Sequence, residues 1–218
     1  MMLLYGVVPA DATAPERRGL AGQRLEMIRG MLAALIVEEC SERLNATGDE
    51  ARTFAEIICD LATTTSILPI RFPTMLPTRS AVAAELQANE AAWRRRLTEL
   101  DGLSEVIIRA QWAEADSELG SASNSSGTTY LMNRAASIHR WDASVAEITE
   151  VVRAWAREVK VLRRQKGVRL ACLVANADVT QLRDAVTTWQ QAGSDRKTAV
   201  SGPWPVFSFV DDQEALSA

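Results

Sequence analysis

Few side chains in this sequence of 218 residues could act as catalysts at neutral pH. His139 is the only histidine, so a Ser-His-Asp triad or a Cys-His pair would have to include it. It lies beside Ile138 in a helical apolar pattern, which is more typical of a surface or boundary histidine than of a general base. Cys40, Cys59 and Cys172 are far apart and form no CxxC pair. Neither a zinc site nor a disulfide framework is therefore expected, and reduced thiols indicate a cytoplasmic protein.

Motifs for phosphate or nucleophile chemistry are also missing from the sequence. It has no GxGxxG loop and no GxxxxGK(S/T) loop, and Ser201 is not the centre of a GxSxG elbow. Carboxylates gather at residues 114–118 and 211–212, without the spacing of a calcium-binding loop. We therefore predict no catalytic residues, no cofactor and no metal ligands. An enzyme that relies on Asp or Glu alone is the least favoured class of function.

Composition narrows the class of partner. The net charge is −4 and the pI about 5.2, whereas domains that bind nucleic acid usually have a basic excess, so nucleic acid is not expected. The longest apolar run, residues 31–37, is too short to span a membrane. Residues 1–9 are apolar and precede an A-x-A pattern, but no Lys or Arg comes before them, which favours a buried strand over a signal peptide. We expect a soluble, cytoplasmic protein that does not bind membranes.

Two basic runs could bind an anion. Residues 94–96 are three arginines within a predicted helix. A second group lies at the expected end of a long helix and consists of Arg153, Arg157, Lys160, Arg163, Arg164, Lys166 and Arg169. Cations there complement the helix dipole, and neighbouring glutamates dilute the charge. The alternative function that these residues leave open is an anion- or nucleotide-binding regulator.

The first half of the chain predicts a small sheet with two helices. Apolar runs predict three strands, the last two joined as a hairpin at Gly30: residues 3–8, 24–28 and 31–37. Thr47 and Glu50 match a capping box, so a helix should begin there and end near residue 67, before Pro69. Two further segments follow, a proline-broken edge strand or loop at residues 67–76 and a helix at residues 80–100 that Gly102 ends.

The second half contains the clearest periodic signal. Apolar residues recur every three or four positions from Ile138 to Leu162, which predicts one long helix. Packing on the protein's own sheet is favoured, and a coiled-coil partner is the alternative. The flanking residues predict a loop at 117–129, a helix capped by Asp178, and strands at 105–112, 168–175 and 198–210. This order predicts an α+β fold of two small domains, residues 1–102 and 103–218.

Four motifs, in this order, resemble those of the GvpF/GvpL family of gas vesicle proteins. They are residues 4–9 (LYGVVP), 68–74 (LPIRFPT), 127–131 (GTTYL) and the closing segment 201–209 (SGPWPVFSF). Four positions depart from the family pattern: Pro73 replaces a glycine, Phe54 replaces a histidine found in many members, and Val206-Phe207 replaces Pro-Tyr. The sequence is therefore similar to a divergent member of the family.

The resemblance implies two α+β domains, the second a modified ferredoxin-like fold, and a non-enzymatic protein of the gas vesicle. Its partners would be the small shell protein GvpA and other Gvp accessory proteins, during nucleation or growth of the vesicle. We expect the partner-binding surface to include Arg71, Phe72 and Thr74 together with Trp204. Arg71 stands between apolar residues and needs an acceptor, for which an internal carboxylate is favoured over a partner.

Overall fold

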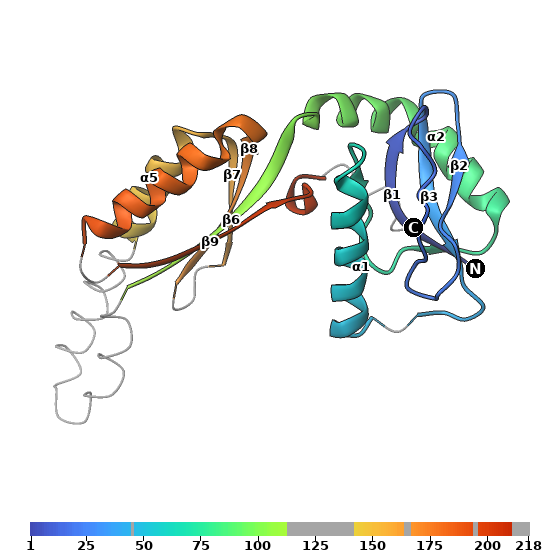
Figure 1. Ribbon diagram of the computed structural model, residues 1–218, viewed down its shortest axis with the longest axis horizontal. Coiled ribbons are helices and arrows are strands. Elements are labelled where there is room, and N and C mark those ends of the chain that lie inside the picture. The colour runs from blue at the N-terminus through green and yellow to red at the C-terminus, as the bar shows by residue number, and fades with distance from the viewer. Residues whose placement is uncertain (45, 113–141, 164–166, 194–195, 211–218) are drawn as a thin grey trace, which may run out of the picture. The chain divides into compact units, whose positions relative to one another are not determined.

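The prediction of an α+β fold is confirmed. The computed structural model describes residues 1–44, 46–112, 142–163, 167–193 and 196–210, which form two antiparallel sheets with helices (Figure 1). The chain divides into two compact units after Gly102, and the second unit is Leu103–Trp204. Residues 205–210, which the sequence placed with the second domain, group with residues 1–102 in the first unit.

The sheet of the first unit is built from apolar strands. β1 (Met2–Pro9) pairs on one side with β3 (Ala33–Glu39), which pairs in turn with β2 (Glu26–Arg29). On its other side β1 pairs with two strands of two residues each, β4 (Leu68–Pro69) and β5 (Met75–Leu76). The predicted hairpin around Gly30 is thus confirmed. The prolines of residues 67–76 restrict that segment to short edge pairing, because proline cannot donate to a ladder.

Two helices cover the first sheet. α1 (Gly48–Ala62) begins with the predicted capping box and places Phe54, Ile57, Ile58 and Leu61 against one face of β1 and β3. Leu35 and Val37 of β3 are also buried, and alternation along the strand points them to the other face, where α2 (Arg79–Leu100) packs. Figure 1 shows α1 and α2 on different sides of β1 and β3. Gly102, with a φ of +70°, follows α2 in the left-handed conformation expected for a residue that ends a helix.

The second unit has the strand order of a ferredoxin-like fold. β6 (Leu103–Trp112), a helix at residues 142–153, β7 (Ala156–Arg163), β8 (Val168–Ala175), α5 (Val179–Gln191) and β9 (Arg196–Trp204) follow one another along the chain. The antiparallel sheet has the order β7-β8-β6-β9, which is that of a β-α-β-β-α-β unit. One face packs against both helices, with Val106, Ile108, Leu170 and Cys172 from the strands and Ile148, Leu182 and Val186 from the helices.

The long helix predicted up to Leu162 is wrong at its C-terminal end. The described helix ends at residue 153, a turn follows in which the Trp155 N–H donates to the Val152 carbonyl, and β7 begins at Ala156. The spacing from Val152 to Val159 also fits a strand that starts after a turn. Val159 and Val161 are β-branched, and β8 supplies the backbone partners for residues 156–163.

Two predicted features near the C-terminal half are also corrected. Asp178 makes no side-chain capping bond to α5, because the 3₁₀ turn η1 (Asn176–Asp178) already precedes the helix and gives Asp178 a helical backbone. The last strand ends at Trp204 and not at Val210. Beyond Pro205 the chain forms a second 3₁₀ turn, η2 (Phe207–Phe209), so Phe209 is fully buried while Phe207 is exposed, and the two do not share a strand face.

Candidate partner-binding surface

The described residues include no metal site. No three His, Cys, Asp or Glu side chains gather as possible ligands in that part of the chain, and none of its helices is long and apolar enough to cross a membrane. His139 and the acidic residues 114–118 and 211–212 lie outside the described ranges. Burial and the charge of Glu105 raise the pKa of the Cys172 thiol to about 12, so this cysteine is not a nucleophile at neutral pH.

Residues 70–74, which the sequence singled out, are bound to the edge of β1. The Ile70 N–H donates to the Tyr5 carbonyl at 2.9 Å, and the Leu4 N–H donates to the Thr74 carbonyl at 3.0 Å. The Thr74 hydroxyl donates to the Arg71 carbonyl at 2.6 Å and closes the turn between them. Thr74 therefore shapes the segment.

Phe72 belongs to the core of the first unit. Its ring lies 4.9 Å from that of Phe54, which stacks on Tyr5 with a centroid distance of 4.8 Å. Phe72 is partly buried against the cluster that α1 forms with β1 and β3. Aromatic pairs at these separations add to the free energy of burial. The segment is thus held by a row of three aromatic rings, Tyr5 of β1, Phe54 of α1 and Phe72.

Arg71 lies on the exposed side of the same turn. Within the described residues of the first unit its guanidinium makes neither an ion pair nor a hydrogen bond, so the internal carboxylate expected from the sequence is not found there. Among the described residues of this unit, no contact of the side chain would have to break for it to meet a partner. Trp204 belongs to the second unit, where its side chain is 40% exposed and its indole N–H reaches the Ser201 hydroxyl at 3.4 Å.

A buried carboxylate holds the loop before β2 in place. Glu38 of β3 is fully buried, and its oxygens accept from the Tyr5 hydroxyl at 2.7 Å, the Ala21 N–H at 3.1 Å and the Gln23 N–H at 2.9 Å. A Cβ at position 19 would collide with this carboxylate, which explains Gly19. The sequence showed Glu38 as one of several acidic residues after a strand and gave no sign that it is buried.

The tip of the β2–β3 hairpin is a surface that the sequence analysis missed. Met31, expected as the first residue of a strand, lies in the turn and is 91% exposed, and Leu32 beside it is 47% exposed. The Glu90 side chain of α2 accepts from the Leu32 N–H at 2.7 Å and the Ala33 N–H at 3.2 Å. The tip is therefore a fixed apolar projection, and Gly30 before it was the signal that a turn would displace Met31 from the strand.

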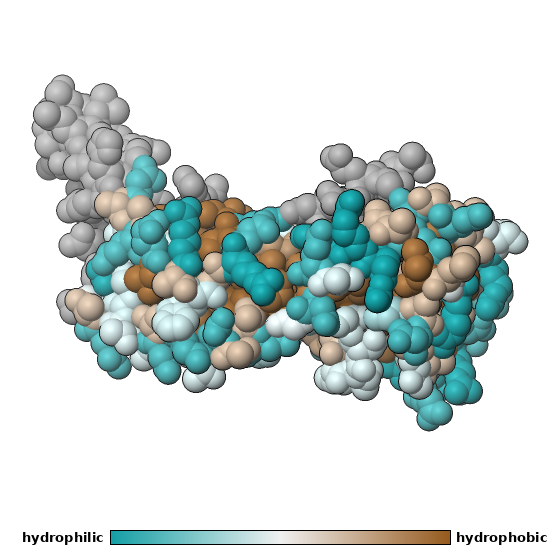
Figure 2. Space-filling model, turned by 90° about the horizontal axis from the view of Figure 1, so that it is seen from above, coloured by the Kyte–Doolittle hydropathy of each residue, from teal (hydrophilic) through white to brown (hydrophobic). Residues whose placement is uncertain are grey.

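The second basic group has different surroundings from those predicted. Because residues 156–163 form a strand, Arg153 stands at the end of the described helix, whereas Arg157, Lys160 and Arg163 belong to β7. Arg153 pairs with Glu150 at 2.8 Å and Lys160 with Glu158 at 3.8 Å, while residues 164–166 lie outside the described ranges. Figure 2 shows, on one face, apolar patches separated by hydrophilic side chains.

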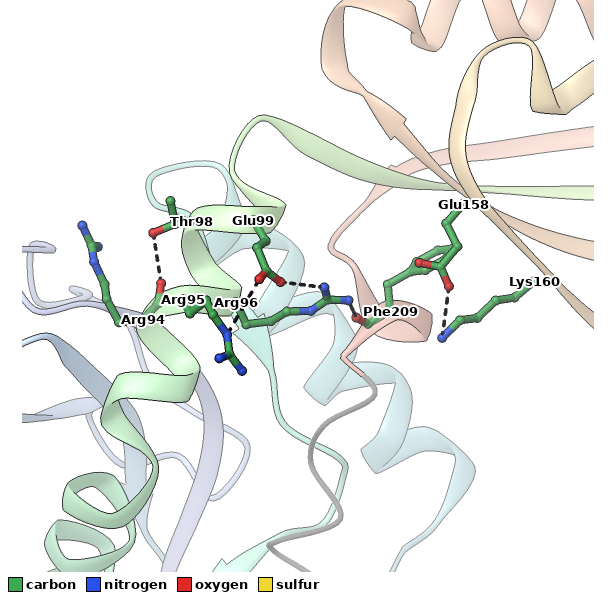
Figure 3. A network of polar contacts seen from close by, with 8 residues as sticks. All are labelled: Arg94, Arg95, Arg96, Thr98, Glu99, Glu158, Lys160 and Phe209. Carbon is green, nitrogen blue, oxygen red and sulfur yellow. Dashed lines mark hydrogen bonds and ion pairs between the residues drawn. The ribbon is translucent and has the colours of Figure 1, made fainter.

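The arginines at residues 94–96 differ in their contacts (Figure 3). Arg96 donates to the Glu99 carboxylate at 3.0 Å and to the Phe209 carbonyl at 2.5 Å, which connects α2 to η2 within the first unit. Arg95 is 3.8 Å from Glu99 and largely exposed. The Arg94 carbonyl accepts from the Thr98 hydroxyl, and its guanidinium has no ion pair among the described residues of this unit.

Comparison with known proteins decides the family. The model of the family described as gas vesicle synthesis protein GvpL/GvpF matches residues 1–211. The chain belongs to this family. Gas vesicle protein F of Streptomyces sp. (strain CB03234) is 28% identical over 240 residues, which cover 95% of this chain and 98% of that protein. The GvpL/GvpF family is one of gas vesicle proteins and is not a known family of enzymes.

Two solved structures share the fold of this GvpL/GvpF protein. The crystal structure of GvpF from Anabaena sp. PCC7120 matches with a TM-score of 0.81 and 16% identity, over 96% of this chain and 95% of that one. GvpF from Microcystis aeruginosa matches with a TM-score of 0.76 and 15% identity, over 96% and 98%. The family resemblance stated from the four motifs is thus confirmed. The roles of Arg71, Phe72, Thr74 and Trp204 in binding stay predictions.

Proposed function

We propose that this GvpL/GvpF protein is an accessory protein of gas vesicle assembly that binds the shell protein GvpA and other Gvp accessory proteins. The observation that carries the proposal is the family match over residues 1–211. The protein acts while vesicles nucleate or grow, in the cytoplasm and on the gas vesicle. It shields apolar surface of the shell protein or orients that protein for addition.

The hairpin tip and Arg71 supply the contacts in the first unit. A partner that covers Met31 gains about 1.5 to 3 kcal/mol from burial of this one side chain. Little ordering is required, since Glu90 already fixes the backbone of the tip. Arg71 adds a charged donor, while Phe72 and Thr74 hold the turn that presents it. Trp204 offers an exposed aromatic side chain in the second unit.

Co-purification tests the proposal directly. Tagged protein is isolated from cells that express the complete gas vesicle gene cluster, and GvpA and the other Gvp proteins are identified by mass spectrometry. The proposal expects GvpA above the level found with a tagged unrelated protein. Deletion of the gene should lower vesicle number or alter vesicle shape. Unchanged vesicle number, shape and buoyancy after deletion would contradict the role in assembly.

Substitutions separate the contact residues from the scaffold. Met31→Ser should weaken GvpA capture about tenfold, as expected for a buried apolar anchor. Leu162→Ser, which replaces another exposed apolar residue in the second unit, is the control for a general loss of apolar surface. Equal capture by wild type and Met31→Ser would remove the tip from the interface.

Arg71→Ala tests the neighbouring turn. We expect weaker GvpA capture with an unchanged melting temperature, because the side chain is exposed and without an ion pair in its own unit. A variant that melts earlier but captures GvpA normally would assign Arg71 to the stability of the fold.

A further inference from the structure

A small cavity opens beside the exposed side of α2 in the first unit. Its volume is about 160 Å³. Leu68, Trp93 and Val210 give it apolar walls, and Arg95, Arg96 and Glu99 add charged groups to the lining. Trp93 and Leu68 are themselves buried, so the core fixes the positions of these two walls.

The mouth of the cavity carries an excess of positive charge. The charged side chains of the lining are two arginines of α2, Arg95 and Arg96, and one carboxylate, that of Glu99. Figure 3 shows Arg96 turned toward the Phe209 carbonyl, whereas Arg94 points away from Glu99. Glu99 is shared between Arg96 at 3.0 Å and Arg95 at 3.8 Å, so it neutralises Arg95 only weakly. The charge opposes the overall net charge of −4.

The size of the cavity restricts what it can hold. Pockets for drug-sized molecules, including nucleotides, measure about 300 to 1,000 Å³. A cavity of about 150 Å³ accommodates one benzene ring. The space beside α2 therefore suits a single ring-sized or branched apolar side chain, with an anionic group beside it that meets Arg95.

We propose that this cavity is an anchor site for an acidic segment of a partner protein. One apolar side chain of the segment enters between Leu68, Trp93 and Val210, and a neighbouring carboxylate of the segment pairs with Arg95. Because Arg96 is engaged with Glu99 and Phe209, it shapes the cavity wall and the exposed Arg95 supplies the charge. The site is separate from the hairpin tip and from Arg71, and it adds a second class of partner contact to the proposed function without depending on it.

A peptide titration tests the site on the full chain. The probe is an acetylated and amidated peptide of sequence DEFDE, followed by ¹H–¹⁵N NMR at up to about 5 mM, since one anchor supports only millimolar affinity. We expect the amide signals of residues 92–96 to shift in a saturable way. Replacement of the phenylalanine by alanine (DEADE), or of the acidic residues by amides (NQFNQ), should each weaken binding about fivefold or more.

Matched variants separate this site from general charge attraction. Ala92→Phe fills the cavity and should abolish saturable binding, whereas Ala91→Phe, on the same helix but outside the cavity lining, should leave it intact. Arg95→Ala should weaken binding about two- to fivefold. Arg52→Ala on α1 is its control, because Arg52 is 73% exposed against 70% for Arg95 and stands 3.7 Å from Asp49.

Several outcomes would overturn the proposal. Equal effects of Arg95→Ala and Arg52→Ala, or full affinity for DEADE, would reduce the binding to nonspecific charge attraction. Full affinity for NQFNQ would show that the carboxylates do not contribute to recognition. Unchanged binding by Ala92→Phe would place the peptide elsewhere. If Asp211→Asn with Asp212→Asn raises the affinity tenfold, the acidic residues that follow Val210 in the sequence occupy the cavity and no partner segment is required.

Discussion

Glu38 shows how a single residue determines the shape of a whole loop. A buried carboxylate is costly to desolvate, and here the cost is offset by charge-assisted hydrogen bonds from Tyr5, Ala21 and Gln23. The Tyr5 hydroxyl, in turn, accepts from the Leu20 N–H at 2.7 Å. Burial raises the pKa of Tyr5 above its ordinary value, so the hydroxyl remains a donor to Glu38.

Removal of this carboxylate should destabilise the first unit. Glu38→Ala leaves a tyrosine hydroxyl and two backbone N–H groups without their acceptor, and we expect the free energy of unfolding to fall by about 2 to 4 kcal/mol. Glu39→Ala is the matched control, since the neighbouring side chain is exposed and should change stability by less than about 0.5 kcal/mol. Urea unfolding measures both. Similar losses in the two variants would show that the hydrogen bonds to Glu38 contribute little.

The thiol of Cys172 makes stability depend on alkaline pH. Its pKa is raised from 9.0 to about 12, first by burial and then by the charge of Glu105. The unfolded chain loses this proton near pH 9 while the folded chain keeps it, so the contribution of the thiol is fully present below pH 9. It falls by about 1.4 kcal/mol per pH unit as the pH rises toward 12.

Cys172→Ala provides the measurement for this dependence. Above pH 9 the free energy of unfolding of the variant should decline less steeply than that of wild type in urea titrations at a series of pH values. A constant difference due to the smaller side chain does not affect the slope. Parallel curves for the two proteins would exclude a role for the thiol.

At the residue scale the sequence could indicate the candidate segment at residues 70–74 but not the structural role of each side chain. Arg71, Phe72 and Thr74 stand together in the motif LPIRFPT, and the structure keeps them in one turn. Their roles differ, because Phe72 stacks in the core while Arg71 is exposed, and that depends on packing against Phe54 of α1, which the motif itself does not reveal. Met31 shows the effect of a small shift in a turn. The strand β3 begins at Ala33 and not at Met31 as expected, so Met31 lies in the turn and is exposed.

At the scale of elements, local capping signals were good predictors only where the backbone was extended. Thr47 has an extended backbone, and its side chain accepts from the Glu50 N–H. The Glu50 carboxylate in turn accepts from the Thr47 N–H at 3.1 Å. Asp178 has an equally favourable side chain but a helical backbone, because the turn η1 begins before it. The residue type is visible in the sequence, whereas the preceding turn is not.

Thr47 and Asp178 should therefore respond differently to the same substitution. Thr47→Ala removes a real capping bond and should lower the free energy of unfolding by about 1 kcal/mol. Asp178→Ala removes none and should cost less than about 0.5 kcal/mol. Thermal unfolding followed by circular dichroism compares them. Equal losses would mean that Asp178 caps α5 in solution.

The apolar spacing from Ile138 to Leu162 fits two structures, one long helix or a helix followed by a strand. A spacing of three and four residues is the same whether the chain stays helical or turns after Val152 and continues as a strand. Pairing with β8 decides between the two, since it provides backbone partners for β7 that an isolated pattern cannot reveal. By contrast, residues 168–175 form a strand as predicted, because their run is short and almost entirely apolar.

At the scale of the molecule, Arg96 connects the closing segment to the first unit. Its guanidinium donates to the carbonyl of Phe209, whose side chain is fully buried. The order of the four motifs predicted the family and an α+β fold. The return of residues 205–210 to the first unit could not be predicted, because it depends on this long-range hydrogen bond and on burial of Phe209.

Arg96→Ala should loosen the closing segment. We expect a loss of about 1 to 3 kcal/mol, as for a hydrogen bond to a charged group, and faster hydrogen exchange at the amides of Phe207 and Phe209. Arg94→Ala, two positions earlier on α2 and without an ion pair in this unit, should leave both unchanged. Exchange at the wild-type rate in Arg96→Ala would show that Phe209 alone retains the segment.

The first unit is made of two stretches of chain that the whole second unit separates in the sequence, and this affects folding during synthesis on the ribosome. Residues 103–204 must all be translated before the segment that Arg96 holds becomes available. At about 5 to 20 residues per second this delay lasts about 5 to 20 s. During that time the second unit can fold to completion, while α2 of the first unit still displays the surface that Phe209 will cover. A newly made chain is therefore most open to chaperones, or to premature contact with shell protein, at the unit that is synthesised first.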